Sequence, residues 1–203
     1  MKPIGILYAT RDGHTRRIAE HIASDLRGRG LDVELKNVGE SGESIHPLDY
    51  SAGVLAASVR CGTHEHEMVK FVKDHVSELS IIPTAFISVT LTEAGVERPE
   101  SSPEERQRFA GDVQRVIDTF FEDTGWRPER VKPIAGALLY TKYNLLLRFV
   151  MKQIAKSAHA DTDTSKDHEY TDWAALDHFV EEFARELAPR SAAASSGGRT
   201  SAL

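Results

Sequence analysis

The chain has 203 residues, enough for one α/β domain with a complete hydrophobic core. Its net charge of −6 argues against general binding to nucleic acid. The single cysteine, Cys61, excludes an intramolecular disulfide and fits a reducing compartment. No basic N-terminal stretch precedes a long apolar one, and no apolar run approaches the ~20 residues of a transmembrane helix. We therefore expect a cytoplasmic protein without a signal peptide.

Strand and helix patterns alternate along the chain. Strands are predicted at 3–9, 31–38, 52–58, 83–90 and 131–139. Helices are predicted at 15–28, over 68–79, at 104–124 and at 173–187, because apolar residues recur there at helical spacing. Such alternation predicts a parallel sheet with both faces covered by helices. Residues 189–203 are rich in Ala, Ser and Gly, so we expect a disordered tail after one domain, 1–188.

The first strand ends in a polar loop, and a helix pattern begins directly after it. The loop has a hydroxyl at each end, Thr10 and Thr15, with Gly13 between them. N–H groups at a helix start lack helical partners and lie at the positive end of the helix dipole, and glycine lets the backbone approach an anion closely. The pattern fits a phosphate-binding loop and equally a plain strand–helix connection with Thr15 near the N-cap. It lacks the dinucleotide and Walker motifs, so a mononucleotide monophosphate is the candidate ligand.

Two more predicted strands end in polar loops. Residues 58–64 follow the third strand and residues 90–103 follow the fourth. In an open parallel sheet, ligands bind outside the carboxyl ends of the strands, where the strand order reverses. We therefore expect the loops 10–15, 58–64 and 90–103 to form one binding site.

Several stretches match a known pattern. They are ATRDGHTRRIA at 9–19, ASVRCG at 57–62, SVTL at 88–91, WRPERVKPIAGALLY at 126–140, RFVMKQI at 148–154, DTDTSK at 161–166 and YTDW at 170–173. These residues resemble the flavodoxin family and, more specifically, its menaquinone-dependent protoporphyrinogen IX dehydrogenases of haem biosynthesis. The resemblance implies a flavodoxin-like three-layer α/β/α sandwich. Its five-stranded parallel sheet would have the order 2-1-3-4-5, with an elaboration at 140–170 before the last helix.

The resemblance also implies a ligand and a reaction. The chain would bind flavin mononucleotide (FMN) and pass electrons from protoporphyrinogen IX to a membrane quinone. The first loop would hold the FMN phosphate, and the second and third would flank the flavin ring. The cofactor-binding residues that this predicts are Thr10, Arg11, Asp12, Gly13, His14, Thr15, Ser58, Val59, Arg60, Cys61, Gly62, Ser88, Val89, Thr90, Leu91 and Thr92. The alternative is a flavodoxin-like electron carrier that docks to redox proteins. A quinone or NAD(P)H reductase is less favoured, because no second dinucleotide motif is visible.

Arg60 is the candidate catalytic residue, because the resemblance places its loop against the flavin ring. A cation there stabilises negative charge on the flavin or clamps a substrate carboxylate, and a solvated surface arginine is the other interpretation. Cys61 and His64 stand where the family leads us to expect aromatic residues that could stack on the flavin or substrate. Cys61, His64 and His66 suggest a metal, but a closed zinc site needs four ligands. No second cluster appears, so we predict no metal site.

The third loop and the elaboration differ in charge. The loop carries Glu93, Glu97 and Glu100, which argues against a substrate with two propionates. The elaboration contains a basic amphipathic stretch, 142–156, without acidic residues. Such a helix either covers the sheet with a basic face to solvent or lies on an anionic membrane, where each cation adds ~1 kcal/mol. In the second case the protein would be peripheral on the inner face of the cell membrane, near the quinone.

Overall fold

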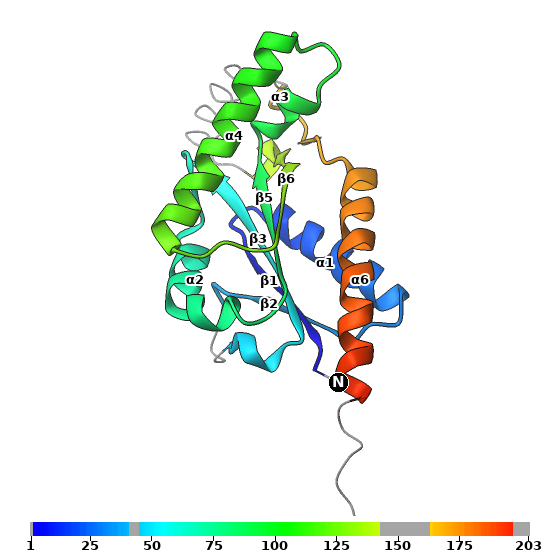
Figure 1. Ribbon diagram of the computed structural model, residues 1–203. Helices are drawn as coiled ribbons and strands as arrows, with labels where there is room; N and C mark the ends of the chain where they lie inside the picture. Colours follow the sequence, from blue (N-terminus) through cyan, green and yellow to red (C-terminus); the bar gives the residue numbers. More distant parts are fainter. Residues whose placement is uncertain (1, 41–44, 143–162, 197–203) are drawn as a thin grey trace, which may run out of the picture.

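The computed structural model describes residues 2–40, 45–142 and 163–196, apart from the side chains of 142 and 188–196. Five parallel strands form a central sheet between two layers of helices (Figure 1). The sheet order is β2-β1-β3-β5-β6, and the short strand β4 pairs only with β3. With β4 set aside this is the predicted order 2-1-3-4-5, so the predicted three-layer α/β/α fold is confirmed.

The elements follow the predicted alternation closely. The main sheet contains β1 (Ile4–Ala9), β2 (Val33–Asn37), β3 (Ala52–Arg60), β4 (Thr63–His64), β5 (Thr84–Thr90) and β6 (Arg130–Ala135). A separate two-stranded sheet contains β7 (Ala137–Leu138) and β8 (His168–Glu169). The helices are α1 (His14–Gly28), α2 (His66–Leu79), α3 (Glu93–Glu97), α4 (Pro103–Thr124) and α6 (Trp173–Ser196), with the 3-10 turns η1 (Pro47–Asp49) and η2 (Tyr140–Lys142).

The strand β1 shows how the sheet is covered on both faces. All its residues are buried, and they alternate between two hydrophobic clusters. Ile4, Ile6 and Tyr8 pack with residues of α1 and α6. Leu7 and Ala9 pack on the other side with residues of α2 and α4. A strand with two buried faces reads as a continuous apolar run, and this explains the apolar sequence of 4–9. The helices α1 and α6 thus cover one face of the sheet, and α2 and α4 the other (Figure 1).

The predicted fifth strand, 131–139, is divided in the structure. The strand β6 ends at Ala135, and the Gly136 N–H donates to the Thr90 carbonyl at 3.1 Å. The chain then leaves the main sheet as β7 and pairs antiparallel with β8, with Ala137 opposite Glu169. The reason is that β5 ends at Thr90, so the next residues have no strand beside them in the main sheet. The small sheet brings the two ends of the elaboration together, and residues 143–162 lie outside the described residues.

Two further boundaries differ from prediction. The predicted loop 90–103 contains the short helix α3, and α4 begins behind Ser102, whose side chain and that of Glu105 form a capping box. The last helix continues to Ser196, so its predicted end at 187 is too early and part of the expected tail is helical. Among the described helices, none combines the length and the apolar character needed to span a membrane.

Candidate functional site

A cavity of about 410 Å³ lies where the carboxyl ends of β1, β3 and β5 meet. Residues of the three predicted loops, 10–15, 58–64 and 90–103, make up most of its wall. The helix α4 and the start of β7 complete it. The volume lies within the range of small-molecule and cofactor sites. The structure therefore brings the three predicted loops together around one site.

The loop 10–15, here called the phosphate loop, is built for an anion. Gly13 has φ of 88° and ψ of −4°, the left-handed conformation that favours glycine, and its N–H donates to Thr10 Oγ1 at 3.0 Å. The helix α1 begins at the next residue without a side-chain cap and without an acidic residue in its first turn. The first N–H groups of the helix therefore keep the capacity to bind an anion at the positive end of the helix dipole.

Thr15 tests whether this loop fits a phosphate. Its side chain is buried, with 1% exposed, and it lines the cavity. Among the described residues, its Oγ1 atom is buried without a hydrogen-bond partner. A buried hydroxyl without a partner costs about 1–3 kcal/mol, so such groups point to a bound ligand or water. A phosphate oxygen at the start of α1 would satisfy Oγ1, and the loop therefore fits the phosphate of FMN.

His14 connects the phosphate loop with the segment before α6. Its Nε2 atom lies 2.7 Å from Thr171 Oγ1, and the Thr171 hydroxyl donates to the Ala135 carbonyl at 2.8 Å. Because that hydroxyl has only one proton, it accepts from His14, and His14 carries a proton on Nε2. Thr171 belongs to the YTDW stretch, so a segment about 160 residues away in sequence supports the phosphate loop.

The second loop is a tight hairpin between β3 and β4. Arg60 pairs with Thr63, and Cys61 and Gly62 form the turn with φ of 51° and 82°. Two successive residues with positive φ are typical of the type I′ turn, which matches the twist of the two strands. Cys61 is thus exposed at the tip of the hairpin, at the edge of the cavity.

His64 points into the core rather than toward a flavin ring. Its side chain is 5% exposed, its Nε2 atom lies 2.9 Å from Ser88 Oγ, and it contacts the rings of Phe86 and Phe120. Burial lowers the pKa of His64 to about 4, so the ring is neutral near pH 7. His64 therefore fastens the hairpin to β5. The expectation that this position could stack on the flavin or substrate does not fit its orientation.

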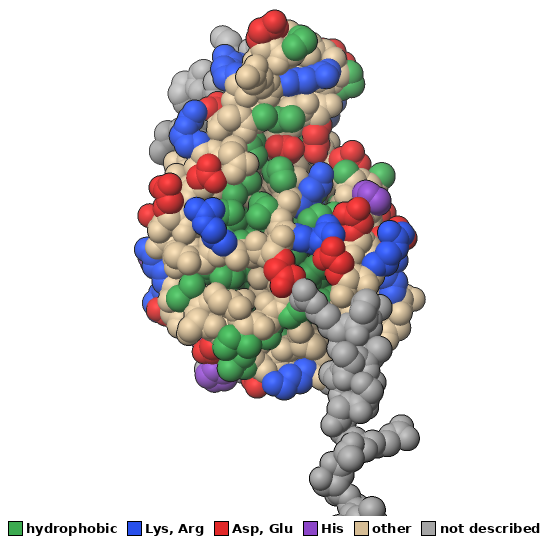
Figure 2. All heavy atoms as spheres, viewed as in Figure 1, with side chains coloured by type: hydrophobic (Ala, Val, Ile, Leu, Met, Phe, Trp, Pro, Cys, Tyr) green, Lys and Arg blue, Asp and Glu red, His purple; other side chains and the backbone are tan. Residues whose placement is uncertain are grey.

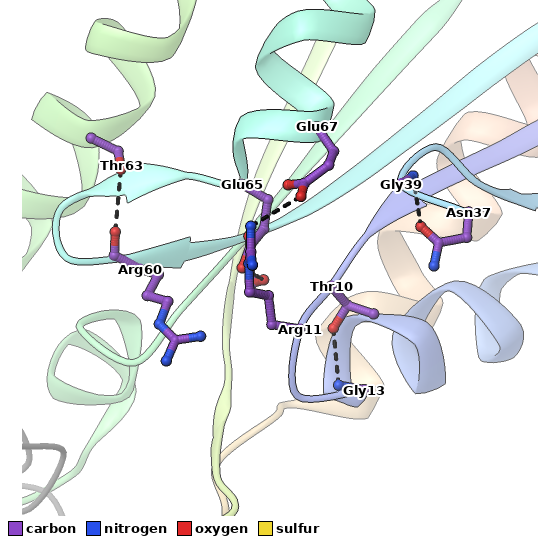
Figure 3. A network of polar contacts seen from close by, with 10 residues as sticks. Thr10, Arg11, Gly13, Asn37, Gly39, Arg60, Thr63, Glu65 and Glu67 are labelled. Atoms are coloured by element: carbon purple, nitrogen blue, oxygen red, sulfur yellow. Dashed lines mark hydrogen bonds and ion pairs between the residues drawn. The ribbon is translucent and has the colours of Figure 1, made fainter. Parts of the chain in front are cut away.

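Three of the predicted cofactor residues do not line the cavity: Arg11, Gly13 and Ser88. Gly13 shapes the phosphate loop, as described above. The Ser88 side chain is 1% exposed and is bonded to His64. The Arg11 guanidinium turns away to Glu65 and Glu67 at the start of α2, where it borders a separate cavity of about 300 Å³ (Figure 3).

Arg60 lines the cavity from the hairpin. Figure 3 shows its side chain extending from the hairpin, without a contact to the other labelled side chains. Its carbonyl accepts from Thr63 Oγ1 at 3.2 Å. Within the described part of the chain its guanidinium has neither a hydrogen bond nor an ion pair, so it can bind an anion that enters the cavity.

No motif in the sequence predicted the side of the cavity that α4 forms. Asp112, Val113, Arg115 and Val116 face it from the middle of this helix. Asp112 and Arg115 form an exposed ion pair at 2.9 Å, with side chains 43% and 74% exposed. Only the apolar pattern of the helix, which includes Val113 and Val116, was a signal in the sequence. That pattern does not distinguish a residue facing the sheet from one facing a ligand.

The acidic residues of the third loop lie outside the cavity wall. Glu93, Glu97 and Glu100 do not line it. Burial raises the pKa of Glu93, and Lys132 opposes this effect. Desolvation, with Glu93 and Asp172 nearby, raises the pKa of Glu97 to about 7. The charge unfavourable to a substrate carboxylate is therefore smaller and further from the cavity than the sequence suggests. Among the described residues no cluster of His, Cys, Asp and Glu could hold a metal ion.

The face seen in Figure 2 carries basic and acidic side chains interspersed with one another. Such a surface differs from the single-sign patch that steers a highly charged partner. The candidate binding site is therefore the cavity and not the charged surface of this face.

Comparison with known proteins places the chain in a family. The family model described as a flavodoxin domain matches residues 5–165. Protoporphyrinogen IX dehydrogenase (quinone) of Escherichia coli (strain K12) is 37% identical over 183 residues, 90% of this chain and 93% of that protein. A protein of the same name from Leishmania major is 34% identical over 183 residues, 88% of this chain and 73% of that protein. Among solved structures, oxidised flavodoxin 1 of Bacillus cereus is 15% identical, with a TM-score of 0.49, and the match covers 90% of this chain and 97% of that chain.

Proposed function

This chain belongs to the flavodoxin domain family and, within it, to the protoporphyrinogen IX dehydrogenases (quinone), and we propose that it oxidises protoporphyrinogen IX with bound FMN and passes the electrons to a quinone. One observation carries the proposal beyond a simple electron carrier. Two stretches resemble the dehydrogenases specifically: 126–140, which contributes to the wall of the cavity, and 161–173, which contacts the phosphate loop. Gly136 and Ala137 line the cavity, and Thr171 is bonded to His14 of the phosphate loop.

The residues proposed to hold FMN follow from the cavity wall. Thr10, Thr15 and the backbone N–H groups at the start of α1 would bind the phosphate. The hairpin, 58–62, and the end of β5, 89–92, would flank the flavin ring. The side chain of Arg11 is left out of this set, because it is engaged by Glu65 and Glu67.

Bound FMN supplies two-electron redox chemistry between the tetrapyrrole and the quinone. The overall oxidation of protoporphyrinogen IX removes six electrons and six protons, so three quinones are reduced for each porphyrin formed. Val59, Val89, Val113 and Val116 give the cavity apolar walls that exclude water from the reacting atoms. Arg60, which has no partner among the described residues, would bind a propionate carboxylate of the substrate at the mouth of the cavity.

The test is an anaerobic assay with purified protein, FMN, protoporphyrinogen IX and a menaquinone analogue, followed by porphyrin fluorescence. We expect porphyrin to form only when both FMN and the quinone are present. An absence of turnover, together with ready one-electron exchange with a redox protein, would instead support the electron carrier.

We also propose that the protein is peripheral on the membrane that contains its quinone. The proposal rests on the basic amphipathic sequence of 142–156, which lies outside the described side chains. Co-sedimentation with anionic liposomes tests it. The variant Arg148→Glu/Lys152→Glu should bind less than the wild type, and equal binding would remove 142–156 from this role.

A further inference from the structure

We propose that Glu65 is a positioning residue that ties the phosphate loop to the β3–β4 hairpin and so holds two walls of the FMN cavity in their binding geometry. The inference rests on the proposed binding of FMN. It concerns a residue that lines the cavity but that no pattern in the sequence singled out.

Glu65 makes contacts with both loops. It is the N-cap residue of α2 and is only 5% exposed. Its N–H donates to the Ser58 carbonyl at 3.0 Å, and its carboxylate accepts from Ser58 Oγ at 3.2 Å. The other carboxylate oxygen accepts from Arg11 Nε at 2.9 Å (Figure 3). A single buried carboxylate thus joins β3 directly to the phosphate loop.

The contact also decides what Arg11 does. Its guanidinium donates to Glu65 and, through Nη2, to Glu67 at 3.0 Å. Held between two carboxylates, it faces the second cavity and not the FMN cavity. The phosphate therefore depends on the hydroxyls of Thr10 and Thr15 and on backbone N–H groups. These neutral donors are effective only when the loop that carries them is held in place.

Glu67 provides a matched control. It also pairs with Arg11, but its side chain is 38% exposed. Among the described residues it has no hydrogen bond to Ser58, and it does not line the FMN cavity. An exposed ion pair is weakened by solvent, whereas a buried carboxylate that loses its partner has no water to replace it. The geometry therefore assigns the positioning role to Glu65 and not to Glu67.

The experiment compares FMN with riboflavin, which has the same ring but no phosphate. Binding of each to the purified protein is measured by quenching of flavin fluorescence for the wild type, Glu65→Gln, Arg11→Gln and Glu67→Gln. We expect Glu65→Gln and Arg11→Gln to weaken FMN binding about tenfold and riboflavin binding less than about twofold. Both variants keep the Glu65 backbone N–H bond to Ser58 and an acceptor oxygen for the Ser58 hydroxyl, and both lose the charge-assisted bond at the phosphate loop. Glu67→Gln should change either affinity by less than about twofold.

Several outcomes would overturn the inference. Equal losses for FMN and riboflavin would mean a general loss of structure, and an equal effect of Glu67→Gln would mean that Arg11 needs no buried partner. Tighter FMN binding by Glu65→Gln would mean that the carboxylate repels the phosphate. Arg11, with 53% of its side chain exposed, tests the same contact if Glu65→Gln does not fold. A wild type that binds FMN without oxidising protoporphyrinogen IX would overturn the proposed function alone, and one that does not bind FMN would overturn both.

Discussion

The two ends of the cavity differ in burial and charge. At the phosphate loop the donors available to a phosphate, the threonine hydroxyls and the backbone N–H groups, are neutral, and Thr15 is buried. At the opposite end, the tip of the hairpin and α4 present Cys61, Arg60 and Arg115 to solvent or to the cavity mouth. Buried neutral donors suit a ligand that stays, since they need not be desolvated at each turnover. Exposed cations suit a charged molecule that enters and leaves. On the proposed function, the phosphate loop would be the cofactor end of the cavity and the hairpin tip with α4 the substrate end.

The hairpin at the substrate end is held to β5 by the buried side chain of His64. Protonation of His64 gives the largest expected change in stability. The folded protein disfavours protonation of His64, whereas the unfolded chain binds that proton near pH 6.5, so the free energy of unfolding falls as pH falls from about 6.5 toward about 4. We expect a loss of about 3 kcal/mol over that range, measured by urea denaturation. The free energy of unfolding of His64→Gln should lack this pH dependence. If the wild type and the variant lose stability in parallel as pH falls, His64 does not hold the hairpin as a buried neutral group.

The cofactor end is tested by Thr15→Val, which removes the hydroxyl and keeps the shape of the side chain. FMN should bind about 10- to 100-fold more weakly, because a hydrogen bond to a charged group is worth about 1.5–3 kcal/mol. The FMN-free protein should become more stable by about 1 kcal/mol, because a buried hydroxyl without a partner is removed. Thr15→Ser is the control that keeps the hydroxyl. A loss of riboflavin binding equal to that of FMN would place Thr15 away from the phosphate.

The substrate end is tested by Arg60→Gln. The KM for protoporphyrinogen IX should rise about tenfold, since one charge-assisted hydrogen bond to a carboxylate is lost. The affinity for FMN should fall less than the KM rises, because the donors to the phosphate in loop 10–15 are unchanged. The KM of Arg60→Lys should lie between those of the wild type and Arg60→Gln, because lysine keeps the charge and loses the bidentate geometry. A shifted flavin potential with an unchanged KM would place Arg60 beside the ring instead.

Arg115→Gln should have the smallest effect. Arg115 pairs with Asp112 one helical turn away, and both side chains are largely exposed. The free energy of unfolding should change by less than about 0.5 kcal/mol in a thermal or urea melt. A change in kcat/KM above about twofold would show that Arg115 contacts the substrate and that α4 is part of the specificity surface.

The phosphate loop was predictable because its chemistry is local. A buried strand, a glycine that adopts positive φ, two threonines and a helix start occupy adjacent positions in the sequence. The strand order was also predictable, because alternating strands and helices resemble a known family over most of the chain. By contrast, the division of 131–139 into β6 and β7 depends on β8, about 30 residues further on, and no local pattern encodes that pairing.

The sequence by itself determined the order of the strands and the glycine-containing loop at the start of α1, and its resemblance to a known family predicted the ligand of that loop. Only the tertiary structure decided that Arg11 turns to Glu65, that His64 faces the core, and that α4 forms a wall of the cavity. The physical reason is range: backbone N–H groups and a glycine turn act within one segment, whereas the direction of a long side chain depends on which partners other segments bring to it. The phosphate loop can therefore be predicted from the sequence, whereas the contacts that hold it in position are seen only in the folded structure.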